Sequence, residues 1–518
     1  MEDSRYWLDI LCQQLTHKYQ DKKIVIASGA TPSGPYHVGH IKEIFTADAI
    51  RLAMDKLGYS SYHIHFIDSF DTLRKRYPYL PKSYEEQVGK PLYLIPSMDK
   101  KAANYAQGHF AKFSKSLPKL GIDKLDFVWM HKVYQQGKMA KAISIALKNR
   151  QKIAKILNKI SVRKLDENWW PIQISDKSTN SLRTAKFISY DEKLGLVSYL
   201  SQDGNKYQAD INKGEIKLDW RLDWLARWYI YDVDIEPFGR EHASAGGSWD
   251  TSKVIAKEIY GIEPPIPVAY ENIHLKGDSK KMSSSVGNLV SIEDALKIIP
   301  PEILRYFVLK SRPEKQLSFD PGIGIYNLID EFAKVAVETA DKKNPQFEQA
   351  YELSVLVKDK QTVSKIPFSH LVTCYQSAQG NIDETFVVLE RTGYGTETKS
   401  EPEVIKRQLK NVDYWLKNYA PDNVKFALQK KLPKLDLSIN QKQFLASLAD
   451  LMEKDKNLSA QAIHDAIYNI ATKFGIKPAE AFKTIYYLFL AQDSGPKAGF
   501  FLVTLKRDFV IRRLRLKD

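Results

Sequence analysis

The stretch KKIVIASGATPSGPYHVGH, residues 22–40, decides the fold. An apolar strand is expected to end at Ile26, residues 28–35 are rich in turn formers, and apolar residues then recur at helical spacing over 41–57. A second strand is predicted at 62–67, YHIHFI. Together these segments predict a βαβ unit whose two strands run parallel.

The remaining chain extends this unit into a larger α/β protein. The expected fold class is a doubly wound, parallel-sheet (Rossmann-type) catalytic domain with an α+β insertion and a C-terminal all-α region. The predicted regions are 1–90, the first half of the catalytic domain; 91–225, an insertion of helices and a small antiparallel patch; 226–290, the second half of the catalytic domain; 291–345, a helical junction; and 346–518, an α-helical region.

The composition is that of a large protein with a mild basic excess. The chain has 518 residues, 77 Lys or Arg against 62 Asp or Glu, and a formal net charge of +15, which favours a polyanionic partner. Only Cys12 and Cys374 are present, as expected in a reducing cytosol. No secretion signal or apolar run long enough to span a membrane is found, so we expect a cytoplasmic protein.

Two histidines, His37 and His40, stand three residues apart where the first predicted helix opens. They lie on one helix face, and Gly39 between them leaves space for a flat ligand against the backbone. Helix N-termini at the carboxyl ends of parallel strands favour phosphate groups, so a nucleotide is the expected ligand. Two imidazoles make an incomplete metal site, and we predict no metal here. The alternative is that both rings only cap or pack the turn.

A second motif, KGDSKKMSSSVGN at residues 276–288, combines three lysines, four serines and two glycines in a predicted loop. Ammonium groups on such a loop can stabilise the charge that develops on an α-phosphate and its leaving pyrophosphate. Lys281 is the first candidate for that role and Lys280 the second. Alone, the loop could be a polar surface turn, but its pairing with HVGH favours nucleotide chemistry.

TPSGPYHVGH and KMSSS resemble the HIGH and KMSKS signatures of class I aminoacyl-tRNA synthetases. Longer stretches resemble the class I lysyl-tRNA synthetase family: ASGATPSGPYHVGHIKEIFTA, HIHFIDSFDTLRK, ENWWP, KLDWRLDW, EPFGREHASAGGSWDT and AQDSGPKAGFF. The resemblance covers nearly the whole chain and is weakest at 173–213 and 346–415. It implies activation of lysine with ATP to lysyl-adenylate and pyrophosphate, followed by transfer of lysine to the 3′ end of tRNA(Lys).

The resemblance also implies roles for individual residues. The implied catalytic residues are His37, His40 and Lys281, and the implied ATP-binding residues are Thr31, His37, Gly39, His40, Lys280, Lys281 and Ser283. The implied lysine-binding residues are Gly29, Thr31, Trp220, His242 and Tyr270. Aromatic faces can flank the stem of lysine and attract its ammonium group, and a carboxylate should lie close, with Glu241 and Asp68 as candidates. Taken singly, Trp220 and Tyr270 could instead be core aromatics.

Two departures from the family pattern bear on the cofactors. Ser284 stands where the second lysine of KMSKS is usual, so Lys281 is expected to carry the phosphate contact, with Lys280 in support. Relatives can hold zinc in the insertion through Cys and His, but residues 173–213 contain neither, and we predict no structural zinc. Mg²⁺ is expected to arrive with ATP.

The resemblance implies that region 346–518 binds the tRNA anticodon. The basic C-terminal run TLKRDFVIRRLRLKD at 504–518 could offer one helical face to phosphate, or it could be only a solvated terminus. Anticodon bases are expected to be read by stacking and edge contacts. The aromatic candidates are Tyr468, Phe474, Tyr486 and Tyr487, most of which have the spacing of core residues. We expect a monomer with no membrane partner.

Three other functions are compatible with parts of the sequence. A small-molecule nucleotidyltransferase would share the HxGH turn but would explain neither KMSSS nor the long helical region. A non-catalytic RNA-binding paralogue is disfavoured by intact His37, His40 and Lys281. A related synthetase could activate glutamate, arginine or cysteine. Specificity for cysteine is disfavoured because the chain lacks the Cys and His set of a zinc-type site, and specificity for glutamate would need a basic pocket.

Overall fold

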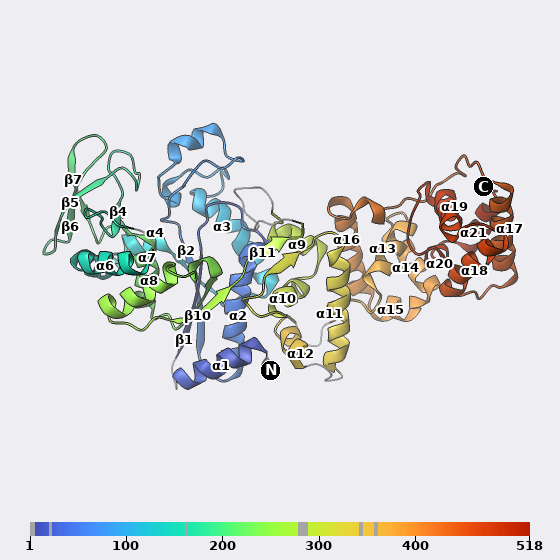
Figure 1. Ribbon diagram of the computed structural model, residues 1–518, viewed down its shortest axis with the longest axis horizontal. Coiled ribbons are helices and arrows are strands. Elements are labelled where there is room, and N and C mark those ends of the chain that lie inside the picture. Colours follow the sequence, from blue (N-terminus) through green and yellow to red (C-terminus); the bar gives the residue numbers. More distant parts are fainter. Residues whose placement is uncertain are drawn as a thin grey trace. The chain divides into compact units, whose positions relative to one another are not determined.

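The structure is a computed structural model that describes residues 6–19, 23–161, 164–277, 289–340, 345–356 and 361–517. Its elements are labelled in Figure 1. The chain divides into two compact units, which are described separately below. The first unit comprises residues 1–295, 304–319 and 344–356, and the second comprises 296–303, 320–343 and 357–518. The limits of the five predicted regions stay a prediction.

A five-stranded parallel sheet forms the centre of the first unit. Its order is β10-β9-β1-β2-β3, with bounds Ile266–Tyr270 (β10), Ile235–Gly239 (β9), Ile24–Ala30 (β1), Ser61–Ile67 (β2) and Asp126–Trp129 (β3). The first strand continues to Ala30, so the turn predicted from residue 28 starts too early. Residues 27–30 are poor strand formers, but β2 pairs with β1 in register from Ile24–Ser61 to Ala30–Ile67.

Helices cover both faces of this sheet, which confirms the doubly wound class. Ala27 and Phe66 pack in one core with Leu225 of α7 (Trp220–Tyr231), whereas the His65 ring on the opposite face lies 6.3 Å from Phe110 of α3 (Tyr105–Ser116). The helix α2 (Ile41–Lys56) follows β1 and contacts β1, β2 and β9. The strand order reverses between β1 and β9, and ligands of such sheets bind at the carboxyl ends of strands beside the reversal.

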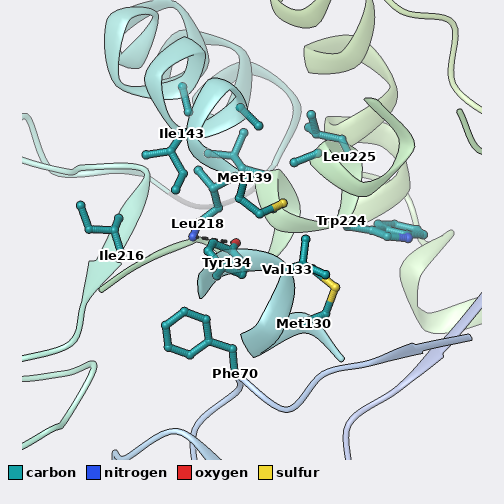
Figure 2. Close-up of a cluster of buried hydrophobic side chains, with 14 of the residues drawn as sticks. Phe70, Met130, Val133, Tyr134, Met139, Ile143, Ile216, Leu218, Trp224 and Leu225 are labelled. Carbon is teal, nitrogen blue, oxygen red and sulfur yellow. Dashed lines mark hydrogen bonds between the residues drawn. The ribbon is translucent and has the colours of Figure 1, made fainter. Parts of the chain in front are cut away.

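The region between β3 and β9 contains helices and antiparallel strands. Its helices are α4 (Met130–Gln135), α5 (Ala140–Lys148) and α6 (Arg150–Ile160); its strands are β4 (Ile172–Ile174) paired with β8 (Ile216–Leu218), and β5 (Lys186–Asp191), β6 (Leu196–Leu200) and β7 (Lys206–Asp210) in one antiparallel sheet. Figure 2 shows the core that joins this insertion to α7, with Tyr134 accepting a hydrogen bond from Leu218 N at 3.1 Å.

A second, smaller core lies between β2 and α3. Eight buried side chains form it: Leu73, Tyr77, Leu80, Tyr84, Leu92, Ile95, Tyr105 and Ala106. The backbone there is irregular, with 3₁₀ turns at Lys82–Gln87 and Leu92–Leu94. This hydrophobic cluster is what holds a segment with little regular hydrogen bonding in one conformation.

The remaining elements of the first unit include α1 (Trp7–Lys18), α8 (Ser248–Ile255), α12 (Pro345–Glu352) and the parallel pair β11 (Ile273–Leu275) and β12 (Leu317–Phe319); α9 (Ile292–Ile298) and α10 (Pro301–Leu309) fall across the division. The helices of the second unit are α11 (Gly324–Ala340), α13 (Phe368–Ser377), α14 (Ile382–Leu389), α15 (Gly395–Ser400), α16 (Pro402–Asn418), α17 (Ile439–Lys454), α18 (Ala460–Lys473), α19 (Pro478–Leu490), α20 (Ala498–Leu502) and α21 (Arg507–Leu514). Among the described residues, no helix is long and apolar enough to span a membrane.

Candidate active site

The two histidines of HVGH form a reciprocal cap at the start of a short 3₁₀ turn, Val38–His40, that leads into α2. The Nδ1 atom of His37 accepts a hydrogen bond from Gly39 N, and Nδ1 of His40 accepts one from His37 N, both at 3.1 Å. The ring centroids lie 4.1 Å apart. Because Nδ1 of each ring accepts a backbone N–H, a neutral ring carries its proton on Nε2 and can donate it to an anion.

The segments on either side of the KMSSS loop are both held beside this turn. Val38 N donates to Val290 O at 3.0 Å, and His37 forms an isolated bridge with Ser291. On the other side, β11 contacts the 3₁₀ turn. The predicted loop residues Lys280, Lys281, Ser283 and Ser284 lie outside the described residues.

A buried carboxyl group, Glu43, joins the His-bearing helix to two of the predicted lysine-binding residues. One oxygen of Glu43 accepts from Gly29 N at 2.6 Å, and the other accepts from the Tyr270 hydroxyl at 2.5 Å. Burial raises the pKa of Glu43 to about 8, even though both hydrogen bonds lower it. The backbone at Gly29 is closely packed, because a Cβ added there would lie only 3.3 Å from the Phe66 carbonyl oxygen. A larger residue would therefore crowd this position.

A buried ion network lies beside Gly29. Arg227 of α7 pairs with Asp68 at 2.5 Å and also with Asp223, and its side chain is 3% exposed. Lys217 of β8 pairs with Asp71 at 3.1 Å. Burial raises the pKa of Asp68 to about 6 although Arg227 lowers it, whereas Arg227 and Lys217 hold the pKa of Asp223 below its usual value against the effect of burial.

Thr31, just after β1, and Tyr134 of the insertion both bond to carboxylates of this network. The Thr31 hydroxyl donates to Asp71 at 3.1 Å. The Tyr134 hydroxyl donates to Asp223 and accepts from Leu218 N. The insertion core therefore fixes the position of a carboxylate that belongs to the site.

A further buried carboxyl group, Glu236 of β9, sits between two tryptophans of α7. The indole of Trp224 donates to one oxygen at 2.9 Å, and that of Trp228 donates to the other at 2.6 Å. Neither donor carries a charge, so burial still raises the pKa of Glu236 to about 7.

Trp220 and His242 form an aromatic wall next to the ion network. Their ring centroids are 5.7 Å apart, and Trp220 also stacks on Trp224 at 5.8 Å. The Arg227 guanidinium carbon lies 5.5 Å from the centre of the Trp220 ring. Trp220 is only partly buried, so its indole is not simply a core residue.

Acidic groups outnumber basic ones in this buried cluster. The carboxyl groups are Glu43, Asp68, Asp71, Asp223 and Glu236, and the cations that pair within it are Arg227 and Lys217. The three raised carboxyl pKa values follow from burial without enough neighbouring positive charge. Such a site can accept a ligand with ammonium groups far better than one with an extra carboxylate.

The structure brings together Gly29, Thr31, Trp220, His242 and Tyr270 at the carboxyl ends of the strands, through direct contacts and shared partners. Asp68 is buried among them, whereas Glu241 is exposed. Sequence reasoning missed Glu43, Glu236 and Lys217. A signal existed only for Glu43, which follows His40 by three residues, in the first turn of α2.

Metal ligands do not gather at this site. Within the part of the chain that the structure describes, no group of three or more His, Cys, Asp or Glu is placed to hold a metal ion.

Part of the basic C-terminal run is engaged inside the second unit. Arg513 is 1% exposed and donates to the carbonyl oxygens of Leu488 and Lys431, and Arg515 pairs with Asp450 and Glu453. Of the aromatic candidates, Tyr468 and Tyr487 are exposed, Tyr486 is 9% exposed and Phe474 packs at the edge of the core.

Comparisons with known proteins give consistent results over the whole chain. Residues 5–357 match a family model described as tRNA synthetases class I (K), and residues 403–517 match an anticodon binding domain. A lysine–tRNA ligase from Methanosarcina barkeri is 38% identical over 99% of this chain and 98% of that protein. One from Archaeoglobus fulgidus is 35% identical over 98% of this chain and 99% of its own length. Among solved structures, a glutamate tRNA ligase from Elizabethkingia meningosepticum aligns with 96% of this chain and 99% of that chain, at 12% identity and a TM-score of 0.41.

Proposed function

The chain belongs to the class I lysyl-tRNA synthetase family, and from that premise we propose how its residues ligate lysine to tRNA(Lys) with ATP. In the first step the lysine carboxylate attacks the α-phosphorus of ATP, which forms lysyl-adenylate and releases pyrophosphate. In the second step a ribose hydroxyl at the 3′ end of tRNA attacks the adenylate carbonyl carbon and releases AMP. The observation that carries the lysine assignment is the excess of buried carboxyl groups around Gly29, Thr31 and Trp220.

Charge stabilisation on phosphate is the role that we propose for His37 and His40. Their Nε2–H groups donate to phosphate oxygens as negative charge builds up, because Nδ1 is used by the backbone cap. No general base is needed, since the lysine carboxylate is already ionised. We propose that Gly39 leaves space for adenine and that Thr31 contacts both ATP and lysine. Lys281, Lys280 and Ser283 are proposed to contact the phosphates. Mg²⁺ would arrive with ATP and neutralise part of the phosphate charge.

The lysine substrate is held by the acidic cluster and the aromatic wall. Its stem lies against Trp220 and His242, and its ammonium groups face the carboxyl groups of Asp68 and Glu43. Glu43 takes the place that sequence reasoning gave to Glu241, because Glu43 is buried and contacts both Gly29 and Tyr270. A glutamate substrate would bring a side-chain carboxylate into a site where carboxyl groups already outnumber the cations that pair with them. This disfavours the glutamate alternative.

The region proposed to bind the anticodon is 346–518, supported by the domain match at 403–517. The exposed rings of Tyr468 and Tyr487 are the best placed of the four candidates to stack on unpaired bases. A monomeric state, a cytoplasmic location and the lack of structural zinc stay predictions.

The affinity for lysine should depend on pH because of the raised carboxyl pKa values. An ammonium ligand favours the ionised forms of Asp68, Glu236 and Glu43, whose pKa values are about 6, 7 and 8. As the pH falls from 8 to 6 these groups take up protons, so the KM for lysine should rise by about tenfold or more. Steady-state kinetics across this range measures the effect. Glu43→Gln should flatten the upper part of the profile, whereas a KM for lysine that stays constant or falls in acid would rule out the proposed contacts.

The specificity is tested by amino-acid-dependent ATP–pyrophosphate exchange. All twenty amino acids are screened with and without total tRNA, and lysine alone should support exchange, because its second ammonium group compensates the buried acids. Exchange with another amino acid would keep the chemistry but overturn the specificity. Silence under every condition would favour the non-catalytic RNA-binding alternative.

A further inference from the structure

A cavity of about 500 Å³ lies beside the His motif, entirely within the first unit. Its size is typical of ligand sites, which span about 300–1,000 Å³. Four segments line it: the loop before His37, the irregular segment before α3, α3 itself and the residues at 291–293. The side chains that matter for its chemistry are Tyr36, Tyr79, Tyr105, His109, Lys112 and Phe113. We call it the aromatic cavity.

One wall of the aromatic cavity is shared with the His motif. The Tyr36 ring stacks on Phe113 with centroids 4.3 Å apart and an interplanar angle of 10°, and its centroid lies 4.8 Å from that of His40. The Tyr105 hydroxyl donates to Ser33 O at 2.7 Å, which ties α3 to the same loop. The cavity is therefore separated from the catalytic histidines by about one aromatic ring, and its walls are held by the small core before α3.

The chemistry of the lining suits an unpaired nucleotide. Tyr79 is 37% exposed, and the His109 ring meets Tyr105 edge to face at 4.5 Å. Burial lowers the pKa of His109 to about 4, so its ring is neutral near pH 7 and can stack or bond with a base. Lys112 follows one turn later on α3 and is exposed, as is appropriate for a phosphate contact. Aromatic faces beside a cation are the usual features of sites for single-stranded nucleic acid.

The segment that contributes Tyr79, His109 and Lys112 to the aromatic cavity is basic overall, which favours an anionic ligand in its surroundings. Residues 70–120 contain ten Lys or Arg and four Asp or Glu. Three of these acids, Asp71, Glu85 and Glu86, do not line the cavity. Asp99 lines it and is exposed, as does Glu293 from the segment at 291–293. Carboxylates accept hydrogen bonds from the exocyclic amino groups of cytosine and adenine. A nucleotide whose base has such a group fits a cavity lined by Lys112 and these two acids.

We propose that the aromatic cavity binds a nucleotide of the single-stranded 3′ end of tRNA, adjacent to the terminal nucleotide that accepts lysine. This inference rests on the proposed function, because it requires the adenylate to form at the His motif. The terminal ribose must reach the adenylate, so its neighbour has to lie within one nucleotide step of the histidines. The Tyr36 wall brings the aromatic cavity that close, and its base and phosphate contacts hold the end of the tRNA in register for transfer.

The test compares two lysines of α3 that differ in their place relative to the cavity. Lys112 lines the aromatic cavity, whereas Lys115 is exposed on the same helix and lines no part of it. We expect Lys112→Glu and His109→Ala each to raise the KM for tRNA(Lys) about tenfold, and Lys115→Glu to change it less than threefold. Binding of a non-hydrolysable lysyl-adenylate analogue should stay within twofold in all three variants.

Comparing the binding of full-length tRNA(Lys) with that of a tRNA(Lys) lacking its last three nucleotides tests whether the cavity contacts the 3′ end. The unaltered protein should bind it more weakly than full-length tRNA, whereas Lys112→Glu and His109→Ala should bind both RNAs equally. An equal loss of affinity for both RNAs would mean a contact elsewhere on the tRNA and would overturn the proposal. Weaker binding of the analogue would assign the cavity to ATP. Failure of the unaltered protein to bind the analogue would instead refute the proposed function.

Discussion

Replacing His40 by glutamine should lower the rate of lysine-dependent ATP–pyrophosphate exchange by about 10²–10³-fold, with little effect on stability. His40 does two things through two different nitrogens. Its Nδ1 atom accepts the backbone N–H of His37, and its Nε2–H is the proposed donor to phosphate. Glutamine is a natural residue at this capping position and can still accept the backbone N–H. It lacks the second nitrogen, and loss of one donor to developing charge costs about this factor.

The exchange assay is run in the presence of tRNA, so that any need for tRNA in activation does not affect the comparison. His40→Ala is the matched variant, because alanine removes both functions. It should show the same loss of rate and, in addition, a fall in unfolding free energy of about 1 kcal/mol from the missing cap. A glutamine variant that retains the rate of the unaltered protein would show that Nε2–H does not act in the transition state.

Replacing Arg227 by methionine should lower the unfolding free energy of the first unit by about 3–5 kcal/mol at pH 7.5. The guanidinium pairs with two buried carboxylates, Asp68 and Asp223, and methionine would leave both without their main cation. Urea denaturation followed by tryptophan fluorescence measures the change, since α7 itself carries Trp220, Trp224 and Trp228. Arg227→Lys retains the charge and should recover most of the loss.

The same variant should recover part of its stability in acid. Without Arg227 the folded-state pKa of Asp68, which burial already raises, rises further above that of the unfolded chain, and the pKa of Asp223 rises as well. Ionisation of these groups then opposes folding, and protonation relieves the penalty. The deficit should therefore shrink as the pH falls from 7.5 toward 5. Arg240, whose side chain is 65% exposed and pairs with Glu271, is the control, and Arg240→Met should cost less than about 1 kcal/mol. Equal effects at the two positions would contradict a buried network.

The fold was largely predictable because its signals are local. Apolar periodicity located β1, α2 and β2, and the turn residues marked the His motif between them. The end of β1 was missed because Ala27, Ser28 and Gly29 have weak strand preference, and their strand conformation comes from pairing with β2, more than thirty residues away in sequence.

From residue spacing alone, without the family resemblance, the site was predictable only where its residues are close in sequence. The spacing of His37 and His40 suggested a shared face, and the structure shows a shared cap. Glu236 gave no signal, because its partners Trp224 and Trp228 come from another element. A basic terminal run likewise does not show which guanidinium is buried, and here it is that of Arg513, which bonds to backbone carbonyl oxygens.

The helix α2 directly follows the proposed phosphate-binding turn and carries the carboxyl group that bonds to two proposed lysine-binding residues. His40 precedes α2, and Glu43, within its first turn, bonds to Gly29 and Tyr270. A movement of α2 on ATP binding would shift the groups around Gly29 and Tyr270, so we expect lysine and ATP to bind cooperatively. By thermodynamic reciprocity, the factor by which lysine changes the affinity for ATP equals the factor by which ATP changes the affinity for lysine. The helix α2 and the turn before it would thus couple the binding of the two substrates.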